Sequence, residues 1–227
     1  VFMKLKELKY ERYILSTRPV LWLPLYRSGG SVIRSADGFG HIATVNGATW
    51  GSTGRIFNGS TDYINIPDAD SLDATTTITI LAWVKANTLS STESHHIITK
   101  RSGTTGNYGI NLESGAGNKD KIQFYFFSPA GTVRTLIADA GLSTATWYQV
   151  GITFTSSGTC ILYQDAVNIK QATIAFDMLA NTAPVNIGGL GAEESLDGLI
   201  PEVWIYNRVL TPIEIQNNYL ATRWRYQ

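Results

Sequence analysis

The sequence predicts an all-β fold, a two-sheet antiparallel sandwich with a short helix near each end. About ten short runs of alternating apolar and polar residues follow one another at roughly 8–12-residue spacing, which is typical of sandwiches and barrels. Clusters of Gly, Ser, Thr and Asn separate these runs. No helical pattern lies between successive runs, which disfavours a parallel sheet of βαβ units. With 227 residues, 44% of them hydrophobic, the chain is long enough for one such core.

The expected strands begin with an extended segment over 19–25, where Pro19 and Pro24 each remove a backbone donor and so favour a sheet edge. The clearest two-residue periods lie at 77–85 and 147–154, and they predict strands with one face on the core. The other expected strands are 63–66, 96–99, 108–112, 122–126, 133–137, 161–163, 185–187 and 203–206.

Two helices are expected outside this series of strands. Residues 4–15 place Leu5, Leu8 and Leu15 near one face of a short amphipathic helix, and the segment 17–19 ends it at a proline. Near the other end, Thr211-Pro212-Ile213-Glu214 is a capping box with proline at the first helical position. It predicts a helix over 212–222, followed by an aromatic and basic tail.

Composition excludes some partners. Lys+Arg and Asp+Glu are both 18, so no net charge draws the chain to nucleic acid or to an anionic membrane. No stretch approaches the roughly 20 apolar residues of a membrane span. We therefore expect neither nucleic acid nor membrane as a partner. The single cysteine, Cys160, cannot form a disulfide within the chain and is expected to be a small buried side chain.

Four stretches resemble the laminin-G-like (concanavalin-A-like) jelly-roll family. They are the opening PVLW at 19–22 with NGATW at 46–50, RIFNGSTDYINIP at 55–67, ITILAWVK at 78–85 and LDGLIPEVWIYNRVLT at 196–211. The resemblance implies a jelly-roll sandwich over 19–227, with residues 1–18 as an N-terminal helical extension. It also implies binding to carbohydrates or cell surfaces.

Related domains often hold a calcium ion in their loops, but Asn58 and Pro201 stand where this family usually has aspartate. Calcium takes several oxygen ligands, typically including carboxylates. We therefore expect no cofactor. If a calcium site persists, Asp37 and Asp197 are its candidate ligands, because each lies in a glycine-containing loop that the family uses near its ion.

Three other patterns are weak as reactive sites. The acidic stretch 68–73 lacks the glycine and distal glutamate of an EF-hand loop, which favours a solvated turn. The pair His95-His96 has no third zinc ligand at a known spacing, which favours a polar hairpin loop. The Glu-x-Asp-x-x-Glu signature of the superfamily's glucanases is missing, and the pair Glu193-Glu194 does not replace it. We expect no enzyme.

The tryptophans divide into two groups. Trp83, Trp147 and Trp204 lie within strand runs and are expected in the core. Trp50 lies beside a turn and is the candidate ligand-binding residue, since an exposed ring can stack on a sugar. Trp224 lies in the C-terminal tail and is expected to dock the chain end on the fold or on a neighbour.

The leading functional hypothesis is a non-catalytic structural component of a virion, either capsid-decorating or tail-associated. The first nine residues lack the features of a secretion signal, so we expect synthesis in a host cytoplasm and assembly into particles. A helix of a dozen residues is marginal alone in water. Leu5, Leu8, Leu15 and Trp224 would then dock to other virion proteins or to copies of the chain. The alternative is a lectin-like adhesion module, extracellular or on a cell surface, with a glycan as partner.

Overall fold

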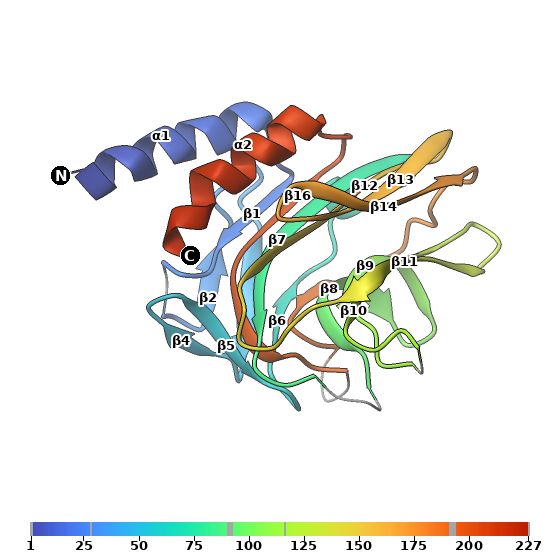
Figure 1. Cartoon of the computed structure of the whole chain (residues 1–227), viewed down its shortest axis with the longest axis horizontal. Coiled ribbons are helices and arrows are strands. Elements are labelled where there is room, and N and C mark those ends of the chain that lie inside the picture. Colours follow the sequence, from blue (N-terminus) through green and yellow to red (C-terminus); the bar gives the residue numbers. More distant parts are fainter. Residues whose placement is uncertain (1, 28, 90–92, 116, 191–193, 227) are drawn as a thin grey trace.

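The computed structural model describes residues 2–27, 29–89, 93–115, 117–190 and 194–226, and it has the predicted all-β sandwich (Figure 1). All strand pairs in both sheets are antiparallel. Sheet A has the order β14 (Val167–Ile174), β13 (Gly158–Gln164), β12 (Tyr148–Thr155), β7 (Thr77–Ala86), β16 (Asp197–Tyr206), β5 (Gly54–Asn58) and β4 (Thr49–Gly51), and β1 (Leu21–Pro24) also pairs with β16. Sheet B has the order β11 (Val133–Gly141), β10 (Lys121–Phe127), β9 (Thr105–Leu112), β8 (His95–Ser102), β15 (Val185–Ile187), β6 (Tyr63–Ile66), β3 (Ile42–Asn46) and β2 (Val32–Arg34).

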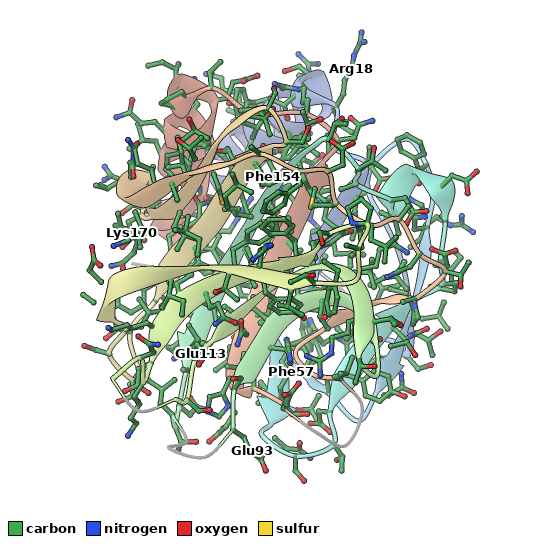
Figure 2. All side chains as sticks on the ribbon, turned by 90° about the vertical axis from the view of Figure 1, so that its right-hand side faces the viewer. Arg18, Phe57, Glu93, Glu113, Phe154 and Lys170 are labelled. Atoms are coloured by element: carbon green, nitrogen blue, oxygen red, sulfur yellow. The ribbon has the colours of Figure 1, made fainter. Side chains whose placement is uncertain are left out.

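The main core lies between the two sheets. Alternate residues of β10, including Phe124 and Phe126, point inward and meet Phe154 of β12, whose ring centroid is 4.9 Å from that of Phe126. Figure 2 shows Phe154 in the space between the ribbons of the sheets. Cys160 is fully buried in this core as expected, and burial raises the pKa of its thiol, so the thiol stays protonated.

A third layer covers the outer face of sheet A. Helices α1 (Phe2–Thr17) and α2 (Pro212–Thr222) lie side by side over it (Figure 1), and the 3-10 turn η2 (Arg223–Arg225) follows α2. A second 3-10 turn, η1 (Asp70–Leu72), lies elsewhere, between β6 and β7, with Leu72 in the main core. The side chains of Trp83 and Trp204 point to the third layer and are fully buried, whereas Trp147 is only partly buried. Strand β7 is therefore covered on both faces, which explains its nearly continuous apolar sequence. None of the described helices combines the length and apolarity needed to cross a bilayer.

Helix α2 has the predicted bounds and the predicted cap. The Thr211 hydroxyl accepts a hydrogen bond from the Glu214 amide at 3.2 Å, and the Glu214 carboxylate accepts one from the Thr211 amide at 2.8 Å. Arg208 donates to both oxygens of the same carboxylate, at 3.0 and 2.6 Å. These donors lower the pKa of Glu214 to about 2. The cap therefore also ties the start of α2 to the end of β16.

Helix α1 packs on its own sandwich, so it does not depend on a partner to cover an apolar face. Tyr10 and Ile14 are buried against the tryptophan-rich outer face of sheet A, and the Thr17 hydroxyl lies 3.3 Å from that of Tyr206. These residues recur at helical spacing on the face opposite the predicted leucine stripe. The helix is thus a built-in part of the third layer.

One buried carboxylate joins both ends of the chain. Glu202 of β16 is fully buried and accepts hydrogen bonds from the Tyr10 hydroxyl at 2.9 Å and the Trp22 indole at 2.8 Å. It also accepts from Arg225 at 3.3 Å and from the Tyr226 hydroxyl at 3.4 Å. Burial raises its pKa. Helix α1, β1 and the C-terminal segment therefore meet at a single acceptor group.

Candidate functional site

The outer face of sheet B carries a band of polar side chains, and no described helix lies over it (Figure 1). In β9 and β10 the inward positions are apolar, so Asn111 and Gln123 point outward. Asn111 is paired in register with Gln123 on one side and with His96 of β8 on the other. These three side chains therefore form one row across three strands.

A second row runs beside the first. Gly109 is paired with Tyr125 of β10 and with Thr99 of β8, and the Tyr125 hydroxyl is hydrogen bonded to the Thr99 hydroxyl. A Cβ atom at Gly109 would lie only 2.3 Å from the Tyr125 ring, so the missing side chain lets the ring cross this strand. The row continues from Thr99 through Asn186 of β15 and Asn65 of β6, whose amides are hydrogen bonded at 2.9 Å. We call these two rows, with Arg101, the polar face.

Two hollows lie on the polar face, and Arg101 lines both of them. The first, of about 160 Å³, is lined by Ser94, His96, Arg101, Asn111, Glu113, Gln123, Tyr125, Phe127, Val133 and Glu194. The second, of about 280 Å³, is lined by Tyr63, Asn65, Arg101, Ser102, Gly103, Pro184, Asn186 and Leu190. Both are smaller than the roughly 300–1,000 Å³ of sites that enclose a drug-sized ligand, so each suits one small ring or the end of a chain.

Glu194 is the centre of a charge cluster in the first hollow. The Glu194 carboxylate lies 2.7 Å from His96 Nε2 and 3.4 Å from the Arg101 guanidinium, and the hydrogen bond from His96 lowers the pKa of Glu194. Glu194 has a φ of 53°, a left-handed conformation that is uncommon for a residue with a side chain. Burial raises the pKa of Tyr125 to about 12, so its hydroxyl stays protonated near neutral pH. The hollow is therefore polar, and its lining holds one guanidinium and two carboxylates, those of Glu113 and Glu194.

One buried acceptor in this hollow has unused bonding capacity. Asn111 is 2% exposed, and within the described chain no donor reaches its Oδ1 atom. Leaving such an atom unpaired costs about 1–3 kcal/mol. A hydroxyl group entering the hollow could donate to it. Gln123, 8% exposed, presents a second amide at the same place.

The structure does not bring the two predicted calcium ligands together. Asp37 accepts hydrogen bonds from the backbone N–H of Trp22 and of Phe39, both at 2.8 Å. Asp197 accepts from the Asn87 amide at 3.1 Å and the Thr88 hydroxyl at 2.6 Å. Trp22 pairs with Trp204, seven residues along β16 from Asp197, which separates the two carboxylates by roughly 20 Å. In the described ranges no three acidic, His or Cys side chains group as metal ligands.

The acidic stretch 68–73 is a partly exposed turn, as expected, but two of its carboxylates also hold a lysine: the side chains of Asp68 and Asp73 are 30% and 23% exposed. The fully buried Lys100 ammonium lies 2.5 Å from Asp68, 3.1 Å from Asp73 and within 2.9 Å of the carbonyl oxygens of Asn181 and Ala183. Two carboxylates and two carbonyls make an oxygen set of the kind that calcium prefers. In this chain a tethered ammonium group occupies that set.

The interpretation of His95-His96 as a polar hairpin loop is wrong. Both side chains are buried on β8, and His95 Nδ1 lies 3.0 Å from the Ser195 carbonyl oxygen. A register shift between His96 and Ile98 lets His96 and Thr99 face the same side of the sheet. Glu193 lies outside the described residues, whereas Glu194 joins the polar face.

The two tryptophans singled out from the sequence lie at one end of the molecule, away from the polar face. Trp50 of β4 is 48% exposed, and its indole donates to the Tyr26 carbonyl at 3.2 Å. Trp224 of η2 is partly buried, and the Arg225 guanidinium lies 4.9 Å from its ring centroid and 4.7 Å from that of Tyr26. The predicted docking leucines Leu5, Leu8 and Leu15 are about half exposed, and docking through them stays a prediction.

Sequence reasoning missed the polar face. Its signal was present in the polar positions of the alternating runs, where Asn65, Asn111, Gln123 and Asn186 all carry amides. These residues come from strands far apart in the sequence. Only the strand order β10-β9-β8-β15-β6 makes them neighbours.

Comparison with known proteins shows the superfamily to which this chain belongs. The laminin-G family model of the concanavalin A-like lectin/glucanases superfamily matches residues 58–216, more than half of the chain. The chain therefore belongs to this superfamily. Comparison with curated proteins by sequence gave no match.

Solved structures with a similar fold include several toxin binding domains. The ligand-binding domain of botulinum neurotoxin serotype D, solved in complex with N-acetylneuraminic acid, has a TM-score of 0.72 and 15% identity, over 93% of this chain and 53% of that one. The binding domain of paraclostridial mosquitocidal protein 1 has a TM-score of 0.69 and 16% identity, over 90% and 52%. The serotype G binding domain has a TM-score of 0.71 and 14% identity, over 89% and 50%. The chain thus spans about half the length of each.

Proposed function

We propose that this chain is a non-catalytic carbohydrate-binding domain that recognises a glycan on the polar face of sheet B. The observation that carries the proposal is the unpaired, buried Asn111 Oδ1 in a hollow lined by further amide, imidazole and guanidinium groups. Saccharides present several hydroxyl groups around one ring, and each can both donate and accept hydrogen bonds. A row of fixed amides matches that pattern.

The comparisons support the same class of function. The superfamily includes lectins, and one domain of similar fold was solved with N-acetylneuraminic acid. A glycan receptor on a cell surface would place this domain outside the cell. No comparison supports the virion hypothesis, and the packing of α1 on its own sandwich removes one reason for expecting a docking partner.

The test is binding of the purified domain to a printed array of neutral and sialylated glycans, followed by titration calorimetry with the best ligand. We expect Gln123→Ala to weaken binding about tenfold or more, since its amide faces the hollow. Gln171→Ala, an exposed amide on β14 of sheet A, is the matched control and should bind normally. A blank array, or equal affinity of the two variants, would exclude the proposed site.

A further inference from the structure

A further hollow, which we call the aromatic hollow, lies on the opposite side of the molecule from the polar face, where the two ends of the chain meet over sheet A. It has a volume of about 460 Å³ and is lined by Glu7 of α1, Tyr26, Ser52 and Thr53 of the β4–β5 turn, and residues 224–226. This volume is within the range of small-molecule sites. A larger hollow of about 700 Å³ between α1 and α2 meets it at Trp224, which lines both.

Arg225 presents an unsatisfied donor in this aromatic hollow. Its side chain is 8% exposed, and its Nη1 atom donates to Glu202 at 3.3 Å. Its Nη2 atom has no hydrogen-bond acceptor in the described part of the chain, and the Glu7 carboxylate is 3.9 Å away. A buried guanidinium N–H without an acceptor costs free energy, and a ligand that offers an acceptor to this atom would remove that cost.

The charge around Arg225 indicates that this ligand is neutral. Arg225 lies beside the carboxyl groups of Glu202 and Glu7, and the neighbouring Arg27, which packs on the Tyr26 ring, is paired with Glu11 at 2.6 Å. These two guanidinium groups therefore leave no excess positive charge for an anionic ligand. The rings of Tyr26 and Trp224 supply flat apolar surfaces, with the Arg225 guanidinium about 5 Å from each centroid. The exposed hydroxyl groups of Ser52 and Thr53 complete the rim.

We propose that this aromatic hollow is a second, independent binding site for a neutral saccharide. One sugar ring would lie against Trp224 with its C–H face, and a ring hydroxyl would accept a hydrogen bond from Arg225 Nη2. The hydroxyls of Ser52 and Thr53 would bind the outer edge of the same ring. The inference goes beyond the polar face and does not depend on it.

The test uses the indole N–H signals of the six tryptophans in ¹H–¹⁵N spectra of the full chain. Maltose, cellobiose and lactose are titrated to millimolar concentration, and Trp224→Phe assigns the signal of Trp224. We expect the Trp224 signal to shift and saturate with at least one disaccharide, while the signal of buried Trp83 stays in place. No shift at Trp224 with any of the three would overturn the inference, whatever the glycan array shows.

Three variants separate this site from the polar face. Trp224→Ala should weaken binding of that disaccharide about tenfold, and Thr53→Val should weaken it less, because each removes one contact. Urea unfolding checks that each variant is folded, and Thr53→Val keeps the test valid if Trp224→Ala is not. Gln123→Ala should leave the Trp224 shift unchanged, since it lies on the other sheet. If Gln123→Ala abolishes that shift, there is one site, and the second is disproved.

Discussion

Lys100 shows how much one buried charge constrains this fold. Its ammonium group is fully buried and is held by two carboxylates and two backbone carbonyls that come from two separate segments. An ion pair removed from water gains stability only when its geometry is good and its other donors are satisfied. Here the acidic stretch 68–73 and the segment 181–183 both depend on the same nitrogen.

We expect Lys100→Met to lower the free energy of unfolding by about 3–5 kcal/mol, because it leaves two partly buried carboxylates and two carbonyl oxygens without the ammonium group that binds them. Lys170→Met is the matched control. Lys170 also pairs with an aspartate, Asp139 at 2.6 Å, but that carboxylate is 76% exposed, so the loss should be at most about 1 kcal/mol. Urea unfolding measures both. Equal small losses would show that the Lys100 pair is no stronger than a surface pair.

At the scale of elements, two-residue periodicity located the strands that line the core. The predicted runs 63–66 and 185–187 have the observed bounds, and 77–85 falls short by one residue. Strands β2, β3 (Ile42–Asn46), β4 and β5 (Gly54–Asn58) were not predicted, because each carries at most one fully buried apolar side chain, whereas even the short run 185–187 has two. Strand β14 was missed because it is an edge strand of mostly exposed, polar residues.

Helix α1 shows a limit of the same reasoning. Its leucines mark an apolar stripe, yet the buried face is the opposite one, with Tyr10, Ile14 and Thr17. Both stripes repeat at helical spacing, so periodicity predicts a helix without saying which side is covered. The outer face of sheet A decides this, because Glu202 offers an acceptor to the Tyr10 hydroxyl.

Neighbouring residues of α1 provide a test of that orientation. Ile14→Ala should lower the free energy of unfolding by about 2–5 kcal/mol, since it empties a fully buried position in the third layer. Leu15→Ala, one residue further and 49% exposed, should change it by no more than about 0.5 kcal/mol. Removing residues 1–16 should likewise destabilise the sandwich. A larger effect at Leu15 than at Ile14 would mean that the helix is turned the other way.

Over the whole molecule, the two helices make the sandwich asymmetric. Sheet A gives its outer face to packing, whereas sheet B keeps an outer face of amide and hydroxyl groups. The sequence predicts both sheets and both helices, but it does not say which sheet the helices cover. That choice depends on Trp22, Trp83 and Trp204, which all point to one side of sheet A. The candidate polar face could therefore not be located before the layers were known.

Two carboxyl groups that bind the helical layer have opposite pKa shifts, and together they should determine how the stability of the domain depends on pH. Arg208 and the helix cap hold the pKa of Glu214 at about 2, below its usual 4.5, so its contribution is complete above about pH 4.5 and is lost as pH falls towards 2. Burial raises the pKa of Glu202 above the usual 4.5. Its protonated form therefore contributes fully to the free energy of unfolding below about pH 4.5, and this contribution is lost as the pH rises through the raised pKa.

We therefore expect the free energy of unfolding to pass through a maximum on the acid side of neutrality. Urea titrations from about pH 3 to pH 8 would measure it. Glu214→Gln should flatten the acid limb, because the amide keeps an acceptor but does not titrate. Glu202→Gln should flatten the opposite limb, and its amide oxygen can still accept from Tyr10 and Trp22. An unchanged opposite limb in Glu202→Gln would mean that this carboxyl stays ionised throughout, held by Arg225 and its neutral donors in spite of its burial.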